Sequence, residues 1–415
     1  MKRTTIRGRV SAAAVSAAVA LALAGCGTSS GGSDSGDDGG GSGDDGAAAA
    51  AGFTPPDLPM LEELGDNEGE ISILAWPGYA EDGSNDPKVD WVSSFEEETG
   101  CQATVKYFAT SDEAVNLMKT GEYDVVSASG DASLRMIASG DVEPVNTDLI
   151  PNYANQYDYL KDRDWNSVDG QMYGAPHGYG ANLLMWRTDV VDPAPTSWGV
   201  VFDEASPYSG KVTAYDSPIY IADAALYLMK TQPDLGIENP YSLDEDQLAA
   251  AVDLLKSQRE HVGEYWSDYL KEIQAFTTGD SVVGTTWQVI ANVALGEDVP
   301  IDVTLPEEGA TGWSDTWMVG SESEHKNCAY AWMDHIISPE VNAEATEYFG
   351  EAPSSPDACE VATEGHCESY HAGDEDYASQ IWYWTTPIEQ CIDGRTDVTC
   401  TDYGDWTQAW TEVKG

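Results

Sequence analysis

The sequence predicts an α/β fold in which helices cover both faces of a mostly parallel sheet. Strand-like and helical segments alternate from about residue 69 onward, which is typical of such sheets. The length of 415 residues exceeds that of one average domain, and the apolar content of 41% is sufficient for sizeable cores. We therefore expect two domains with additional segments.

Successive segments of the chain have the patterns of strands and helices in turn. Residues 71–76 are strand-like and end at Pro77-Gly78. Val92 and Phe95 lie at helical spacing in an acidic segment that stops at Gly100. Residues 101–108 again resemble a strand, 112–119 a helix, and 123–126 a short buried strand. This order of elements is that of a βαβ sheet.

A later helix has a recognisable start. Ser242-Leu243-Asp244-Glu245 fits a capping box, with Ser242 as the capping residue. Leu248, Val252 and Leu255 then recur on one helical face. Neither an internal repeat nor a membrane-spanning segment is evident in the sequence that follows residue 25.

The N-terminal residues have the pattern of an export signal. Basic residues within positions 2–9 precede an apolar run over 10–24, and about 15 residues are too few to cross a bilayer core of about 30 Å. We expect a signal peptide over residues 1–25. Leu23-Ala24-Gly25-Cys26 resembles the lipobox of bacterial lipoproteins, and this resemblance implies cleavage before Cys26 and acylation of its sulfur. Residues 26–68 then form a linker rich in Gly, Ser and Asp.

The charge of the chain excludes some classes of partner. With 19 basic and 73 acidic residues, the formal net charge is −54. Phosphates of nucleic acids and anionic membrane surfaces both require basic protein surfaces. Acidic charge along a chain is usually a solvated surface, so only acids inside a pocket are informative about a ligand.

The cysteines predict disulfides. An even number remains after Cys26, as expected of an exported protein, and these are Cys101, Cys328, Cys359, Cys367, Cys391 and Cys400. Many connectivities are open. Cys359–Cys367 and Cys391–Cys400 are close enough to close local loops, which leaves Cys101–Cys328 as a long-range bridge. A zinc site at Cys359, His366, Cys367 and His371 is the alternative, but the paired ligand spacing of zinc sites is missing.

Several segments resemble the spermidine/putrescine-binding protein family of type II periplasmic binding proteins. The resemblance extends over about residues 70–355. The segments are Trp76-Pro77-Gly78-Tyr79, 123–129, 178–186, Pro195-Thr196-Ser197-Trp198, Ala214-Tyr215-Asp216, Thr286-Trp287-Gln288 and Trp313-Ser314-Asp315. Their order and spacing are those of the family.

The resemblance implies two α/β lobes that are joined by crossing strands, with the ligand in the cleft between them. Lobe 1 would comprise residues 69–180 and 317–352, and lobe 2 would comprise 181–316 and 353–415. Cys101 and Cys328 would then lie in the same lobe, which favours their pairing. The fold class that we expect is therefore the two-lobed type II binding-protein fold.

The resemblance also implies a set of ligand-binding residues. They are Trp76, Tyr79, Ser129, Asp131, Asp216, Trp287, Gln288, Trp313, Asp315 and Glu351. An alkylammonium that leaves water needs carboxylates for its charge and aromatic faces for its methylenes. Trp313 and Asp315 are two residues apart on a strand, so both side chains point to one face.

The sequence departs from the family at three positions. Ile219 stands where the family has a second acid near Asp216, Asp131 stands near a family tyrosine, and Glu351 replaces another tyrosine. Acidic residues are thus still present, but at other positions than in the family. Putrescine, spermidine, a betaine or a cationic amino-acid derivative all remain open as ligands.

We expect an exported, lipid-anchored solute-binding protein that captures a small organic cation for the permease subunits of an ABC importer. It would act as a monomer on the outer face of the cell membrane, without cofactor, metal or nucleic acid. One alternative is the same fold with another solute, such as a quaternary amine or a sugar. A second is an exported enzyme, but His177, the only histidine near the proposed cleft, lacks a matching nucleophile or metal set.

Overall fold

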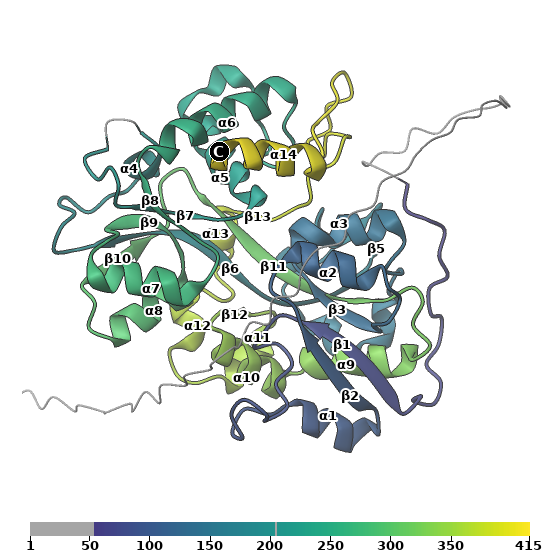
Figure 1. The fold of residues 1–415 in the computed structure, drawn as a ribbon. Coiled ribbons are helices and arrows are strands. Elements are labelled where there is room, and N and C mark those ends of the chain that lie inside the picture. Colours follow the sequence, from purple (N-terminus) through teal and green to yellow (C-terminus); the bar gives the residue numbers. More distant parts are fainter. Residues whose placement is uncertain (1–53, 204–205) are drawn as a thin grey trace, which may run out of the picture. The chain divides into compact units, whose positions relative to one another are not determined.

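The computed structural model describes residues 54–203 and 206–415. Within them, the principal sheet has the strand order β2-β1-β3-β11-β6-β9-β7-β8 (Figure 1). The strands are β1 (Glu70–Ala75), β2 (Gln102–Tyr107), β3 (Val125–Ala128), β6 (Gly174–Arg187), β7 (Val212–Tyr215), β8 (Val262–Trp266), β9 (Val283–Trp287) and β11 (Ala310–Val319). The short strands β10 (Ile301–Thr304) and β12 (Ala352–Pro353) pair with β6, and β13 (Ile381–Tyr383) pairs with β11. A separate hairpin joins β4 (Ser167–Val168) to β5 (Gln171–Met172).

The sheet is mixed rather than mostly parallel, which corrects the expectation from sequence. β1 pairs in parallel with β2 and β3, and β7 pairs in parallel with β8 and β9. The long strands β6 and β11 join these two groups through antiparallel pairing with each other, with β3 and with β9. The alternation of strands and helices predicts the parallel groups, but it contains no information about the direction of the crossing strands.

The helices cover the two groups of strands separately. The helices nearest β1–β3 in sequence are α1 (Val92–Thr99), α2 (Ser111–Met118) and α3 (Gly130–Ser139). Two helices from later in the chain, α9 (Lys326–Ile336) and α10 (Pro339–Phe349), join this group. Those associated with β7–β9 are α4 (Gly199–Phe202), α5 (Ile221–Thr231), α6 (Glu245–Arg259), α7 (Tyr269–Thr278) and α8 (Gln288–Gly296). The buried apolar residues form four clusters in the described part of the chain, and β6 and β11 contribute residues to several of them. The exact lobe boundaries stay a prediction.

Local sequence signals give most of these elements correctly. α1 ends at Gly100, whose φ of 76° suits the left-handed cap that a glycine adopts most easily. The capping box of α6 forms two residues later than predicted, with Asp244 as the cap and Gln247 as its partner. Ser242 cannot serve as the cap because its side chain is buried and contacts Cys400 Sγ at 3.3 Å.

The three predicted disulfides are confirmed. Cys101 pairs with Cys328, Cys359 with Cys367, and Cys391 with Cys400. The predicted signal peptide, Cys26 and most of the linker lie outside the described residues. Among the described residues, helices of the length and apolar character needed to span a bilayer do not occur.

The C-terminal segment (residues 353–415) contacts helices that belong to both groups of strands. It contains α11 (Pro356–Val361), α12 (His366–Ser369), α13 (Glu375–Ala378), β13 and α14 (Tyr403–Lys414). α14 packs against α6 (Figure 1). Between β13 and α14, Thr386 Oγ1 donates to the Gly130 carbonyl of α3 at 2.9 Å. The segment therefore brings residues from the end of the chain next to the crossing strands.

Candidate ligand-binding site

Most predicted ligand-binding residues lie where parallel strands end or where strands cross. Trp76 follows β1, Ser129 follows β3, and Trp287 is the last residue of β9. Ligands of open α/β sheets bind at the carboxyl ends of the strands. Trp313 and Asp315 lie on β11, between the two groups of strands. Residues from several separate segments thus converge on the crossing strands.

A phenol bridges two buried carboxyl groups at the centre of the site. The Tyr79 hydroxyl oxygen lies 2.8 Å from Asp315 Oδ2 and 3.0 Å from Glu351 Oε2. Trp313 Nε1–H donates to the same Glu351 oxygen at 3.0 Å. The second oxygens of both carboxyl groups, Asp315 Oδ1 and Glu351 Oε1, are buried without a hydrogen-bond partner among the described residues. Such acceptors are costly unless a donor meets them.

Burial controls the protonation of these acids. It raises the pKa of Asp315 to about 6, although Ser129 and Tyr79 stabilise the charged form. Burial, and then the charge of Asp315, raise the pKa of Glu351 well above its ordinary value. Burial thus favours the protonated form of Glu351 more strongly than that of Asp315. A cation next to Asp315 would offset the loss of hydration.

Two glycines of β6 make room for this arrangement. Gly178 is opposite Asp315, and Gly180 is opposite Trp313 in the β6–β11 register. A Cβ at Gly178 would lie 2.6 Å from Glu351 Cδ, and a Cβ at Gly180 would collide with the Trp313 ring. Only glycine permits the close approach of both side chains to the strand.

Trp76, Ser129 and Asp131 are also brought together at this end of the sheet. Trp76 Nε1–H donates to Ser129 Oγ at 3.1 Å. Burial raises the pKa of Asp131 to about 6, while Ser111, whose hydroxyl donates to it at 2.8 Å, opposes the shift. The charges of Asp131 and Asp315 act on each other, because the charge of Asp131 contributes to the raised pKa of Asp315.

Four aromatic side chains form a closed ring beside the acids, which we call the aromatic ring. Its ring centroids are separated by 5.3 Å for Trp287–Trp313, 6.2 Å for Trp313–Trp384, 5.7 Å for Trp384–Tyr215 and 5.8 Å for Tyr215–Trp287. Trp287 is oriented by Asn182, whose Oδ1 accepts its indole N–H at 3.0 Å. Burial first, and then the charges of Asp131 and Asp315, raise the pKa of Tyr215.

Tyr215 and Trp384 are residues that the sequence interpretation missed. Tyr215 precedes Asp216 and could have been found by asking which neighbour of Asp216 faces the cleft. Trp384 lies in the aromatic run Trp382-Tyr383-Trp384 near the end of the chain, and only the tertiary structure brings it to β11.

Asp216 is not brought together with the other acids. Its carboxylate accepts from Lys414 Nζ at 3.0 Å and from Trp410 Nε1 at 3.3 Å. Both partners belong to α14. Because the side chain is already paired, its charge is offset within the protein rather than left for a ligand.

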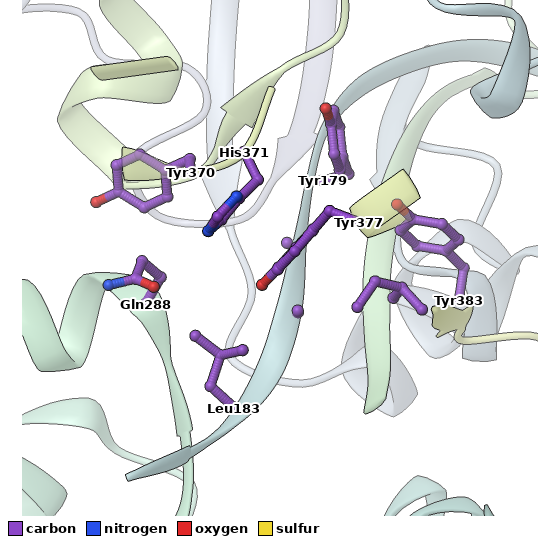
Figure 2. A pocket seen from close by; sticks show the side chains of 10 residues that line it. Tyr179, Leu183, Gln288, Tyr370, His371, Tyr377 and Tyr383 are labelled. Atoms are coloured by element: carbon purple, nitrogen blue, oxygen red, sulfur yellow. The ribbon is translucent and has the colours of Figure 1, made fainter. Parts of the chain in front are cut away.

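Gln288 also lies apart from the acids. It lines a small cavity with Tyr179, Leu183 and residues of the C-terminal segment (Figure 2). Tyr179 and Leu183 alternate with Asn182 and therefore point to the face of β6 opposite Trp287. The cavity measures about 10 Å³, which is about the space of one water molecule. It is too small for an organic ligand.

Comparisons with known proteins point to a transport function. A sequence model described as bacterial extracellular solute-binding protein matches residues 90–366. The chain is 25% identical over 280 residues to a putrescine/cadaverine-binding protein of Pseudomonas aeruginosa, which covers 63% of this chain and 74% of that protein. It is 23% identical over 289 residues to the spermidine/putrescine-binding periplasmic protein of Escherichia coli, which covers 69% and 77%.

Solved structures show the same fold. The spermidine/putrescine ABC transporter substrate-binding protein of Streptococcus pneumoniae aligns with a TM-score of 0.64 and 19% identity. The alignment covers 84% of this chain and 98% of that one. The two-lobed α/β fold expected from the sequence is therefore confirmed.

Proposed function

Because this chain belongs to the bacterial extracellular solute-binding protein family, and is thus a substrate-binding protein of the ABC-transporter type, we propose that it captures a small organic cation of the polyamine type. The family is one of transport proteins and not of enzymes. The ligand would lie between the lobes, in contact with Asp315 and the aromatic ring. The names of the relatives include putrescine and spermidine, which supports this class of ligand.

The observation that carries the proposal is the buried carboxylate of Asp315. Tyr79 and Ser129 stabilise its charged form, but a cationic partner for it is not found among the described residues. Asp315 lies two residues from Trp313 on one face of β11. A buried charge needs an opposite charge or several donors. An ammonium supplies both, and the aromatic faces can cover the methylenes attached to it.

The surroundings favour a cation without a carboxylate of its own. His177 Nε2 lies 3.6 Å from Glu351 Oε1, and the charge of Arg135 acts on Asp131. Burial lowers the pKa of His177 to about 3, so its ring is neutral. Arg135 is paired with Asp112 at 2.7 Å and lies over the ring of Tyr403. A betaine or an amino acid would therefore lack a charged partner for its carboxylate, whereas a diamine would not need one.

Calorimetry on the wild type and on Asp315→Asn tests this proposal. The wild type should bind putrescine or spermidine more tightly than glycine betaine or glucose. Asp315→Asn keeps the shape but removes the charge, so affinity for the amines should fall about 30-fold or more.

Asp216→Asn is the matched control. Its carboxylate is one-third exposed and paired with Lys414, so the change should alter affinity by less than about threefold. A wild type that binds betaine or glucose but neither amine would refute the cation assignment. Equal amine binding by Asp315→Asn and wild type would place Asp315 outside the site.

We also propose that the protein is anchored by lipid at Cys26 and works as a monomer with the permease subunits of an ABC importer. The support is the lipobox-like sequence at 23–26 and the family. The described end of the predicted linker is not free: Gly65 N–H donates to Asn327 Oδ1 at 2.6 Å, and the Glu68 carboxylate accepts from the Cys328 N–H at 2.9 Å. Residues 54–68 therefore belong to the folded body, which corrects the predicted end of the linker at residue 68.

A further inference from the structure

We infer that Trp384, which the C-terminal segment carries to the crossing strands, is a ligand-contacting and specificity-determining residue. This inference rests on the proposed function, because it assigns a role in cation binding. The family match ends at residue 366, so Trp384 lies outside the part of the chain that the family describes. Four observations support the assignment.

The backbone at Trp384 is held from two sides. Its N–H donates to the Gly312 carbonyl of β11 at 2.7 Å, immediately after the parallel pairing of β13 with β11. Its carbonyl oxygen packs against Gly130, the first residue of α3, where a Cβ would collide with it. The position of this residue is therefore determined by a crossing strand and by the helix that carries Asp131.

The Trp384 ring completes the aromatic ring. It is stacked on Tyr215 at an interplanar angle of 9° and lies beside Trp313 at 45°. Without it, Tyr215, Trp287 and Trp313 form an open arc. Neighbouring centroids are 5.3–6.2 Å apart, which is the contact distance of aromatic pairs, so Trp384 extends the aromatic surface that Trp313 and Trp287 begin.

The aromatic ring is partly exposed, which a ligand contact requires. Tyr215 and Trp287 are only half-buried, although both pack against buried apolar residues. Trp384 is buried and borders Tyr215 and Trp313.

The nearby charges make the ring suitable for a cation. Asp131 and Asp315 act on Tyr215 electrostatically. An ammonium that is held by Asp315 would carry its adjacent methylenes, or a second ammonium, against the aromatic faces. A fourth face strengthens that contact and excludes water, so Trp384 should increase affinity for an amine over a neutral solute of equal size.

The test is titration calorimetry with putrescine and spermidine on Trp384→Leu and Trp384→Phe. Loss of one aromatic face should weaken amine binding about 3- to 30-fold in Trp384→Leu. Trp384→Phe should show a smaller loss, because phenylalanine keeps a weaker face in the same place. Trp384→Phe also keeps the inference testable if Trp384→Leu does not fold. Trp406→Phe, a buried tryptophan of α14 outside the aromatic ring, is the matched control and should bind as the wild type does.

Tryptophan fluorescence distinguishes a side chain that contacts the ligand from one that only packs in the core. Putrescine should change the tryptophan fluorescence of the wild type more than that of Trp384→Phe, while Trp406→Phe should respond like the wild type. Wild-type affinity in both Trp384 variants would overturn the inference, even if Asp315→Asn had lost binding as proposed. A wild type that binds neither amine would overturn both the inference and the proposed function.

Discussion

At the scale of single residues, the site combines two buried acids whose pKa values are both raised. Tyr79 has a single hydroxyl proton but lies within hydrogen-bond distance of both Asp315 and Glu351. Burial and the adjacent charge of Asp315 raise the pKa of Glu351, which favours a proton on Glu351. Two charged carboxylates at this distance would repel each other, so a proton on Glu351 favours the charged form of Asp315.

The raised pKa of Asp315 predicts a pH-dependent affinity. A cation favours the charged carboxylate, which burial disfavours in the free protein, so binding should strengthen as pH rises through about 6. Below that pH a proton must leave before the cation binds, and affinity should fall by up to about tenfold per pH unit. Putrescine stays protonated in this range, since alkylamines have pKa values near 10.

Calorimetry with putrescine between about pH 5 and pH 8 measures this dependence. Asp131, whose pKa is also about 6, contributes in the same direction and remains in every variant. Asp315→Asn should therefore bind weakly with a flatter profile. A wild-type affinity that does not change across this range would contradict the assignment of Asp315.

At the scale of elements, the segment from β13 to α14 has an unusual position. Thr386 contacts α3, and the ring of Tyr403 lies beneath the guanidinium of Arg135 at 4.4 Å. α14 then packs against α6, and Lys414 of α14 forms an ion pair with Asp216. The segment thus links the two lobes beside the crossing strands, and the Cys391–Cys400 disulfide closes the loop between these contacts.

Removal of this disulfide should affect both stability and binding. In the chain-entropy model, a bridge across a sequence separation of 9 residues contributes about 2–3 kcal/mol to the free energy of unfolding. Cys391→Ala with Cys400→Ala should lose about that amount in thermal or denaturant unfolding. Putrescine affinity should also fall, because Trp384 is held by the same segment.

The Cys359–Cys367 bridge provides a matched control, with a sequence separation of 8 residues. Its double alanine variant should lose a similar amount of stability while amine affinity stays close to that of the wild type. If both double variants bind putrescine as the wild type does, the Cys391–Cys400 loop has no part in positioning Trp384.

At the scale of the whole molecule, the proposed lipid anchor at Cys26 predicts where the protein is found. An acyl chain contributes about 0.8 kcal/mol of membrane affinity for each buried methylene, so two or three chains anchor a protein firmly. Cys26→Ser should therefore release the protein into the medium. Ser29→Ala, which keeps Cys26, should stay with the membrane fraction. Quantification of the protein in both fractions checks this prediction, and equal membrane retention of both variants would disprove the anchor.

The sequence by itself determined those features that depend on local patterns. Glycine stops, helical spacing and strand alternation predict α1, α2 and β3 because these elements are governed by neighbouring residues. The i, i+2 spacing of Trp313 and Asp315 places both on one face of a strand for the same reason. The two local disulfides follow from short separations in the chain.

Only the tertiary structure decided which distant residues share an environment. Asp216 has the same side chain as Asp315, but α14 brings Lys414 to one of them and Tyr79 and Glu351 surround the other. Trp384 becomes part of the aromatic ring because β13 pairs with β11, a register that no local pattern specifies. The charge that a carboxylate presents to a ligand depends on burial and on partners from other segments, and these exist only once the chain has folded.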